Sequence, residues 1–354
     1  MRDPEYISKQ ALFVREEAQA WGLFERAPSI RFASVDDAGR PVLRTLSGVV
    51  LDGQLCFHGT DDGEKLGLIG REAVASCDEV IAQVPSYYVH PELACPATTY
   101  YLSAIAEGTV ERVDDLELKA RVLTAMMKRY QPEGGYDAIA PDDKRYRKVI
   151  EKLMVAALRP SRLSAKFKLG QHRTLAQIER VLAGLWQRGA TGDLRAIRLV
   201  REAHPARPRP AFLAGPRGSD LCVWPDAEDA KQVAAMLVGQ YWTTDFSEPL
   251  MAQAQRGSTA WVVARDPDSK QVLASARAIS DNARYGYVLD VIVRPELRRQ
   301  RFGHAVMKLL LDHPALRELK SIGLRTRDAQ AVYTGFGFQV VEPPAGSTMA
   351  LLRK

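Results

Sequence analysis

The feature that most constrains this chain is a change in the spacing of apolar residues within residues 287–311. Residues 287–293 form a dense run of β-branched and other apolar side chains, which predicts a strand buried on both faces. Arg294 and Pro295 end this run, because proline cannot donate a hydrogen bond within a sheet. From Phe302 onward the apolar residues follow the period of a helix. A buried strand therefore leads through a short loop into the start of a helix.

The loop between this strand and this helix is strongly basic, since it contains Arg298, Arg299 and Arg301. The first backbone N–H groups of a helix have no partner within the helix, and the positive end of the helix dipole lies at the same place. Such a helix start binds phosphate groups, and the three arginines add positive charge beside it. The pattern predicts a site for a phosphate or a pyrophosphate.

The same loop resembles the acetyl-CoA loop of the GNAT acyltransferases, whose pattern is Gln or Arg, two residues, Gly, one residue, and Gly or Ala. Arg298 and Gly303 match the two ends of this pattern. Arg301 stands where the inner glycine is expected, so either charge replaces the lost N–H contacts or CoA binding is weaker. Residues 331–338 resemble the closing motif of the family, in which a helical tyrosine precedes a Gly-Phe turn. The resemblance covers about the last third of the chain.

This resemblance implies an α/β domain with a mixed sheet flanked by helices, which transfers an acetyl group from acetyl-CoA to a small-molecule amine. The backbone of Val291 and Val293 is expected to bind the pantetheine arm. The residues expected to bind the phosphates of acetyl-CoA are Arg298, Arg299, Gln300, Arg301, Phe302, Gly303 and His304.

The chemistry of acyl transfer points to two catalytic residues. The departing thiolate needs a proton, and Tyr333, with an ordinary pKa of about 10, is the expected acid, as the resemblance implies. The alternative role of Tyr333 is packing on a short helix. The amine must lose a proton, and Asp290 on the central strand is the expected base, directly or through water. The alternative for Asp290 is a buried structural carboxylate, and Asp328 is a rival for either catalytic role.

The first half of the chain has short apolar runs joined by turn residues, which is typical of an antiparallel sheet or barrel. An opening helix is expected over residues 4–23. Asp52 and Gly53 form a strong hairpin signal. Strands are expected over residues 29–35, 41–51, 54–58 and 98–110, the last of them ending in a glycine turn.

Four segments of this half resemble the FMN-binding split barrels, and the nearest branch is that of the pyridoxamine-phosphate-oxidase-like and nitroimidazole-reductase-like proteins. Leu102 departs from the family pattern, because arginine is expected there, and His172 replaces an asparagine. The resemblance implies an antiparallel β split barrel with helices (α+β), in which FMN lies at the interface of a homodimer. Relatives hold haem, a deazaflavin or nothing. The matching segments are residues 44–46, 57–65, 94–103 and 165–173.

Individual cofactor residues follow from the same resemblance. Arg44 is expected to meet the flavin ring or phosphate, and His58 and Lys65 the phosphate. Tyr101 and Ser103 share one face of a strand, because side chains alternate along it. The alternative roles are a surface arginine, a solvated helix start and a half-buried sheet face. The expected FMN residues are Arg44, Thr45, Leu46, His58, Gly59, Lys65, Tyr101, Ser103, Lys168 and Gln171.

A run rich in proline and arginine, residues 203–210, divides the two resemblances. Proline cannot continue a helix, so this run predicts a semi-rigid linker. The expected organisation is an FMN-binding split barrel at residues 1–205, a linker at 206–218 and an acyltransferase domain at 219–354.

Composition limits the remaining function classes. The net charge of +6 suits anionic ligands such as FMN and CoA, and no block of lysine and arginine indicates nucleic acid. No apolar leader or bilayer-length apolar run is visible, so no membrane association is expected. The four cysteines lack metal-ligand spacing, so no metal site is expected, and reduced thiols in the cytoplasm are the simplest interpretation. These cysteines are Cys56, Cys77, Cys95 and Cys222.

Three functions fit these patterns. The first, which we favour, is a bifunctional protein that binds flavin and acetylates a small amine with acetyl-CoA. The second is an acetyltransferase whose barrel serves only to dimerise the chain. The third is a regulator whose binding to another macromolecule responds to flavin or acetyl-CoA.

Overall fold

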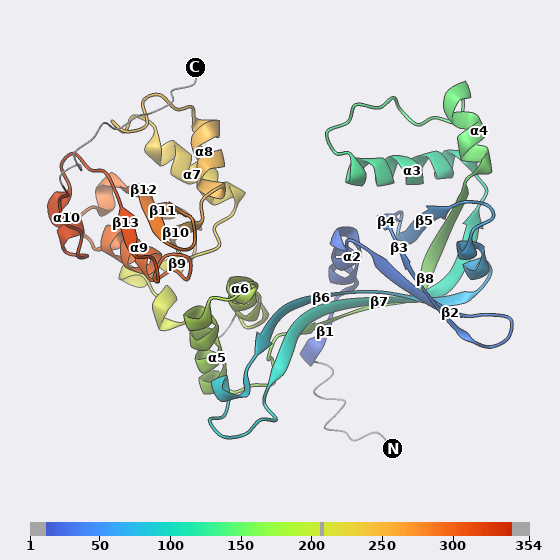
Figure 1. Ribbon diagram of the computed structural model, residues 1–354, viewed down its shortest axis with the longest axis horizontal. Helices are drawn as coiled ribbons and strands as arrows, with labels where there is room; N and C mark the ends of the chain where they lie inside the picture. Colours follow the sequence, from blue (N-terminus) through green and yellow to red (C-terminus); the bar gives the residue numbers. More distant parts are fainter. Residues whose placement is uncertain (1–11, 206–208, 342–354) are drawn as a thin grey trace. The chain divides into compact units, whose positions relative to one another are not determined.

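The computed structural model describes residues 12–205 and 209–341, and these residues form two compact units (Figure 1). The first unit comprises the described residues of 1–185 and 191–206, and the second those of 186–190 and 207–354. Each unit contains its own β-sheet.

The first unit is built on a sheet in which every strand pairing is antiparallel. A short strand, β1 (Val14–Arg15), pairs with the end of β8. The order across the rest of the sheet is β3 (Pro41–Leu46), β2 (Ile30–Val35), β6 (Glu72–Val84), β7 (Thr98–Val113), β8 (Met154–Lys168), β5 (Gln54–Gly59) and β4 (Gly48–Leu51).

This sheet curls round on itself into a barrel. Phe32 on β2 and Phe57 on β5 are separated by three strands in the sheet, yet their ring centroids lie 5.1 Å apart and both side chains are fully buried. Such an approach is only open to a closed or nearly closed sheet. The antiparallel split-barrel architecture expected from the sequence is therefore confirmed.

Helices cover the outside of the barrel. The helix α2 (Glu17–Arg26) packs on β6, β7 and β8, and α3 (Leu116–Tyr130) packs on β4. Asp115 caps α3 by accepting the backbone N–H of Leu118. The remaining helices of this half of the chain are α4 (Lys144–Lys152), α5 (Leu175–Arg188), whose last residues belong to the second unit, and α6 (Asp193–Ala203).

Three expectations for this unit are wrong in detail. The expected opening helix is interrupted: Leu12 and Phe13 are helical, Val14 and Arg15 pair with β8, and α2 begins at Glu17, while residues 1–11 lie outside the described residues. The expected strand 41–51 is broken after Leu46 into β3 and β4. The expected glycine turn is also absent from this stretch. β7 continues through Gly108 to Val113, and a Cβ at Gly108 would overlap the carbonyl of Arg159 on β8.

The second unit contains a mixed sheet, which confirms the α/β expectation for the C-terminal domain. Only β12 and β13 run parallel. The order is β13 (Ser321–Gly323), β12 (Tyr285–Val293), β11 (Val272–Ser280), β10 (Ala260–Arg265) and β9 (Asp220–Cys222).

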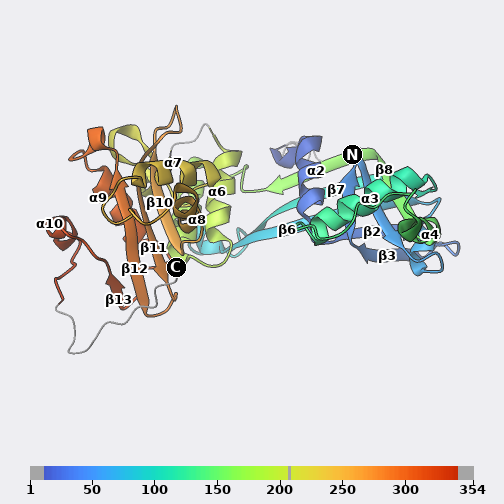
Figure 2. The ribbon, with the colours of Figure 1, turned by 90° about the horizontal axis from the view of Figure 1, so that it is seen from above.

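Helices pack against this sheet on both sides. Figures 1 and 2 show α7 (Ala227–Leu237) and α8 (Glu248–Arg256) side by side, and both contribute to a core with Trp261, Val263 and Ile292. The alternate residues of β10 are buried as well, and α9 (Phe302–Leu311) packs against β10, β11 and β12. A short helix, α10 (Gln330–Thr334), follows β13.

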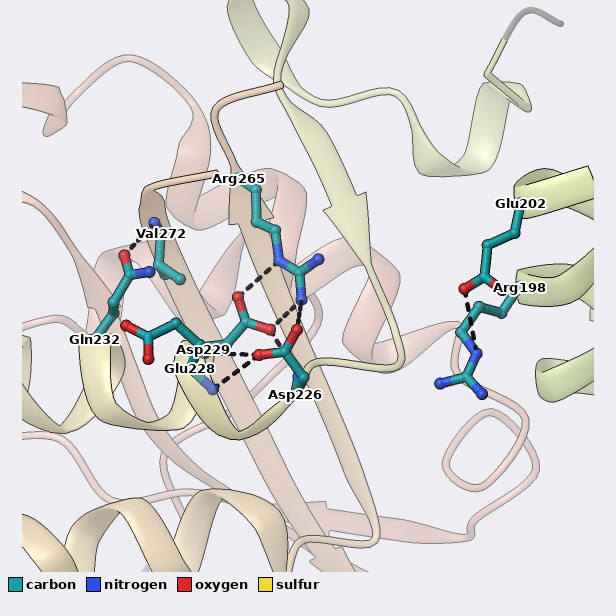
Figure 3. Close-up of polar contacts among 8 residues, drawn as sticks. All are labelled: Arg198, Glu202, Asp226, Glu228, Asp229, Gln232, Arg265 and Val272. Carbon is teal, nitrogen blue, oxygen red and sulfur yellow. Dashed lines mark hydrogen bonds and ion pairs between the residues drawn. The ribbon is translucent and has the colours of Figure 1, made fainter. Parts of the chain in front are cut away.

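Figure 3 shows how α7 is fixed to the sheet. Asp226 accepts hydrogen bonds from the backbone N–H groups of Glu228 and Asp229, and Asp229 accepts one from the N–H of Asp226, which forms a capping box. Arg265, at the end of β10, binds the carboxylate of Asp229 with Nε at 2.7 Å. This ion pair lies in the interior and ties the start of α7 to the strand.

The central strand differs from its prediction. Residues 287–293 were expected to be buried on both faces, but in β12 only Val288 and Ile292 are buried. The pairing with β11 also contains a bulge, because one extra residue of β12 lies between Leu289 and Ile292. Asp290 lies in this bulge with φ at +50°. The remaining residues of β12 are less buried than predicted, and residues 287–291 line a pocket.

Candidate functional site

The second unit has an unpaired strand edge at its centre. β13 pairs with β12 only from Tyr285 to Tyr287, and within the described residues the rest of β12 has no strand on that side. An unpaired edge presents backbone N–H and C=O groups to a ligand. Residues 324–329, which follow β13, diverge from β12, and both segments line one large pocket of about 1120 Å³.

This large pocket brings together several of the predicted site residues. Asp290 and Val291 line it from β12, Asp328 lines it from the segment after β13, and Tyr333 lines it from α10. Burial raises the pKa of Tyr333, and the neighbouring Tyr241 and Asp328 raise it further. The phenol therefore keeps its proton at neutral pH, which a general acid requires.

Asp290 already has partners within the protein. Its Oδ2 accepts a hydrogen bond from Nε of Arg277 at 2.6 Å and another from Nε2 of Gln255 at 3.1 Å. The side chains of Arg277 and Asp290 are only 12% and 11% exposed. A carboxylate held in this way favours the structural role of Asp290, although it also faces the pocket where a base is needed.

The basic loop adopts the geometry that a phosphate site needs. η5 (Pro295–Leu297) leads into it, and α9 begins after Arg301 with no side-chain cap on its first N–H groups. Arg299 and Arg301 both have left-handed backbone, with φ at +64° and +68°. Arg301 thus keeps the conformation that glycine adopts most easily.

A second, smaller pocket of about 330 Å³ lies between the loop and α7. Val293, Arg294, Pro295 and Arg298 form one side of it, and Gln232 and Met236 of α7 contribute to the other. The two predicted backbone contacts on β12 therefore face different pockets, Val291 the large one and Val293 the small one.

Other predicted loop residues contact neighbouring segments. His304 packs against Phe336, with ring centroids 4.9 Å apart, so the two predicted sequence motifs meet in space. Gln300 accepts a hydrogen bond from Arg217. Phe302 is buried in the core, and a Cβ at Gly303 would lie 3.3 Å from Val293.

α8, which was not predicted from the sequence, forms a wall of the large pocket. Leu250, Met251 and Ala254 of this helix line it, together with Tyr241, Trp242 and Phe246 from the preceding segment. A signal was present, because Ser247 precedes an acidic residue and a proline at the first helical positions.

The predicted flavin residues of the first unit fall into two groups. In the first group, Arg44 on β3 pairs with Glu64 at 3.2 Å, and Lys65 donates to the backbone carbonyl of His58 at 2.8 Å. Nε of Arg44 and Nδ1 of His58 are buried without a hydrogen-bond partner. Burial lowers the pKa of His58, and the charge of Lys65 lowers it further.

Three residues near this group have different surroundings. Gly59 continues β5 beside Met154, and Lys65 lies close to it. Thr45 is exposed on β3, whereas the side chain of Leu46 is buried in the core and cannot face a ligand. A Cβ at Gly59 would lie 3.0 Å from the side chains of Lys65 and Met154, so a larger residue would crowd both.

The second group lies on the paired strands β7 and β8. Tyr101 pairs with Lys168 and Ser103 with Lys166, and both lysines lie near the Tyr101 ring, at 5.7 and 6.0 Å. Nζ of Lys168 donates to Thr98 at 2.6 Å. Gln171 instead bonds the backbone of Leu169 and Phe167, which indicates a role in the turn.

Within one chain, the two groups do not meet. Gly59 pairs with Met154 at one end of β8, and Tyr101 pairs with Lys168 at the other. β8 is 15 residues long, and an extended strand of that length spans about 45 Å. A flavin cannot contact both groups of the same chain.

The described part of the chain contains no cluster of three or more His, Cys, Asp or Glu side chains that could hold a metal ion. None of its helices combines the length and the apolar character needed to cross a membrane.

Solved structures similar to this chain fall into two sets. A FAD- and heme-binding protein from Mycobacterium smegmatis is 21% identical, with a TM-score of 0.37 over 43% of this chain and 71% of its own. The flavocytochrome Anf3 from Azotobacter vinelandii is 18% identical, with a TM-score of 0.38 over 44% of this chain and 69% of its own. A protein from Xanthomonas campestris described as a GNAT-family acetyltransferase is 24% identical, with a TM-score of 0.35 over 39% of this chain and 96% of its own.

Two family models match separate parts of the chain. Residues 16–167 match the family described as pyridoxamine 5'-phosphate oxidase, and residues 222–338 match the acetyltransferase (GNAT) family. No curated protein matches the sequence. The chain therefore contains a pyridoxamine 5'-phosphate oxidase-like domain followed by an acetyltransferase domain of the GNAT family.

Proposed function

We propose that the second unit transfers the acetyl group of acetyl-CoA to a small-molecule amine, and that the first unit binds FMN between two copies of the chain. The observation that carries the first part is the open edge of β12. Residues 287–291 of this strand line the pocket that contains Tyr333. Beyond the end of the strand, the basic loop leads to the start of α9, whose first N–H groups have no side-chain cap.

Three parts of acetyl-CoA have a matching surface in the second unit: the pyrophosphate, the pantetheine arm and the acetyl group. The first N–H groups of α9 and the side chains of Arg298 and Arg301 suit the pyrophosphate. The unpaired backbone from Val291 to Val293 suits the amides of the pantetheine arm, because an extended chain can hydrogen-bond a free strand edge. The acetyl end of an arm bound there reaches the large pocket.

The chemical step follows from the groups that line this pocket. The neutral amine attacks the carbonyl carbon of the thioester and forms a C–N bond, and the C–S bond then breaks. Tyr333 gives its proton to the departing sulfur. The attacking nitrogen loses a proton through water, with Asp328 or Asp290 as the final acceptor. Asp328 is the freer of the two, because Arg277 and Gln255 already bind Asp290.

A tryptophan at Gly303 tests the site. A Cβ there already lies 3.3 Å from Val293, so the indole of Gly303→Trp must occupy the space between α9 and the end of β12. We expect the Kd for acetyl-CoA to rise at least about a hundredfold, measured by calorimetry. The unfolding temperature serves as the control for folding. An unchanged Kd in a folded variant would remove this loop from the site.

For the first unit, two unpartnered buried atoms support a phosphate site. Nε of Arg44 and Nδ1 of His58 have no partner, and buried polar atoms are nearly always hydrogen-bonded. A flavin phosphate beside Lys65 would accept hydrogen bonds from both, if Nδ1 carries the proton. When bound, FMN would supply electron or hydride transfer, and Tyr101, Ser103 and Lys168 of the second copy would contact it.

Purified protein tests the flavin proposal directly. We expect a yellow preparation that releases FMN, and not FAD, when it is denatured, with the flavin identified by chromatography. A colourless protein that takes up no flavin on incubation would leave the barrel as a dimerisation domain only.

The cellular setting belongs to the same proposal. Cys56, Cys77, Cys95 and Cys222 are all free thiols in the structure, as expected of a protein in a reducing compartment. Together with the anionic ligands CoA and FMN, this supports a cytoplasmic enzyme. No nucleic-acid partner is proposed.

A further inference from the structure

The acceptor side of the large pocket has an unusual amount of exposed apolar surface. Tyr241, Phe246 and Leu250 are 42%, 53% and 47% exposed, and all three line this pocket. Tyr287, which is 38% exposed, lines it from β12. Isolated apolar side chains on a surface are ordinary, but several that gather in one concave site mark a place where apolar ligands bind.

Except for Tyr287, these side chains come from one continuous stretch, residues 241–250, and they form one wall of the pocket. Tyr241, Trp242 and Phe246 belong to the segment between α7 and α8, and Leu250 belongs to α8. The ring centroids of Tyr241 and Trp242 lie 4.8 Å apart, edge to face. Trp242 packs against the core of the unit, which anchors the wall.

The charged groups of the pocket come from β11, β12 and the segment after β13, and they are Arg277, Asp290, Arg325, Arg327 and Asp328. Arg277 and Asp290 neutralise each other. The guanidinium of Arg327 lies 4.0 Å from the centroid of the Tyr241 ring, a stacking contact. Asp328 lies close enough to Tyr333 to raise its pKa, and it makes no ion pair with any residue that the structure describes. Its carboxylate is thus available for the cation of a ligand, beside the proposed acid.

The size of the pocket also bears on the ligand. At about 1120 Å³ it exceeds the usual range for a drug-sized ligand, roughly 300–1,000 Å³. The acetyl end of the thioester would occupy only part of it. The remaining space adjoins the apolar wall, so a very small polar amine would leave that wall exposed to water.

We infer that the acetyl acceptor is a primary amine carried on an aromatic or branched aliphatic body. The body packs on the wall formed by Tyr241, Phe246 and Leu250, and Asp328 attracts the ammonium group before it loses its proton. This inference rests on the acetyltransferase function proposed above. It excludes amines without an apolar body, such as ethanolamine, and polyamines such as spermidine as preferred acceptors.

An amine panel tests the inference. Release of CoA thiol from acetyl-CoA is followed with 2-phenylethylamine, 3-methylbutylamine, ethanolamine and spermidine. We expect kcat/KM for the two apolar amines to exceed that for the others at least tenfold, since burying one apolar group changes specificity by about 10–200-fold. Equal or higher kcat/KM with ethanolamine or spermidine would overturn the inference, while leaving the acetyltransferase function intact.

Binding without turnover separates the two proposals. Acetyl-CoA binding is measured by calorimetry, and 2-phenylethylamine binding by the fluorescence of Trp242 and the other tryptophans, with Trp242→Phe to assign the signal. Failure to bind acetyl-CoA would refute the transferase function. Binding of acetyl-CoA together with no binding of 2-phenylethylamine would refute the acceptor class alone.

Two aliphatic residues of equal exposure provide a matched pair of variants. Leu250 is 47% exposed and lines the pocket, whereas Ile279 is 46% exposed and does not line it. Leu250→Ala is expected to raise KM for 2-phenylethylamine about fivefold, and Ile279→Ala is expected to leave it unchanged. The KM for acetyl-CoA serves as an internal reference in both. An equal effect of the two variants, or none from Leu250→Ala, would contradict the assigned wall.

Discussion

The two units differ in how completely one chain assembles its predicted site. In the second unit, the predicted residues Asp290, Val291 and Tyr333 line one pocket, and Val293 and Arg298 line a second, smaller one. In the first unit, the predicted flavin residues lie at opposite ends of β8. The acetyltransferase site can therefore be complete in one chain, whereas a flavin site that uses both groups requires a second copy. Family resemblance alone does not reveal this difference.

The comparison also shows how departures from a family pattern are accommodated. In the second unit, Arg301 stands where the family pattern has glycine, and it adopts the left-handed backbone that glycine adopts most easily, so a charge is added at this position. In the first unit, Leu102 replaces an expected arginine and is fully buried. Its side chain belongs to the core of the barrel, so the positive charge beside Tyr101 comes from Lys166 and Lys168.

The largest effect is expected from Tyr333→Phe, which tests whether the second site is complete. Removal of the acid should lower kcat about a hundredfold or more while the Kd for acetyl-CoA stays the same. Because the pKa of Tyr333 is raised, the wild-type rate should hold up to about pH 10 and fall only as the phenol ionises at higher pH. This alkaline decline should be absent in the variant.

Full activity of Tyr333→Phe would make Tyr333 a packing residue and would leave the second site without a known acid. The matched control is Tyr285→Phe, because Tyr285 is exposed on β12 and does not line the pocket. Its kcat should equal that of the wild type.

A mixing experiment tests whether the first site is shared between two copies. Lys65→Ala and Lys168→Ala should each weaken FMN binding in the pure variants. When the two variants are co-expressed, half of the dimers contain both chains, and each such dimer has one intact site and one doubly altered site. About a quarter of the wild-type flavin should then return. No return of flavin would place both lysines in one chain's site or outside it.

The smallest effect is expected from Arg301→Gly, which tests how the departure from the GNAT pattern works. Glycine relieves a left-handed backbone that costs about 1 kcal/mol, but it adds freedom to the unfolded chain, so stability should change by less than about 1 kcal/mol. Loss of the guanidinium should weaken acetyl-CoA binding about three- to tenfold at low salt, and less at high salt. Tighter binding would show instead that the arginine obstructs the backbone.

Local signals in the sequence predicted some elements well and left others unseen. The turn at Asp52 and Gly53 is formed as expected, with both residues at positive φ. The helix from Phe302 begins where its apolar period begins. The strands β6 and β8 were not predicted. β6 mixes small, apolar and polar residues, whereas β8 opens with an apolar run at residues 154–158 that is buried throughout. The burial of both strands depends on neighbours far away in the chain. α8 was not predicted, because its apolar residues do not form a single buried stripe: Leu250 and Ala254 line the pocket, and Met251 also packs in the core.

The candidate sites divide in the same way. The sequence pointed to the basic loop and to Tyr333, because the acetyl-CoA pattern and the Gly-Phe turn are continuous stretches of chain. It did not show that Tyr241, Phe246 and Leu250 form one apolar wall, since the pocket that they line forms only where distant segments of the chain come together. Nor did it show that Asp290 pairs with Arg277 across a bulge.

By itself, the order of residues determined the two-part nature of this chain and the local strand, turn and helix starts. These depend on side-chain period, turn residues and backbone freedom, all of which act over a few residues. Only the tertiary structure decided which face of β12 stays open, which side chains share its pocket, and how far apart the flavin residues lie. Those properties depend on strand pairing and packing between distant segments, where the register of one strand fixes the surroundings of another.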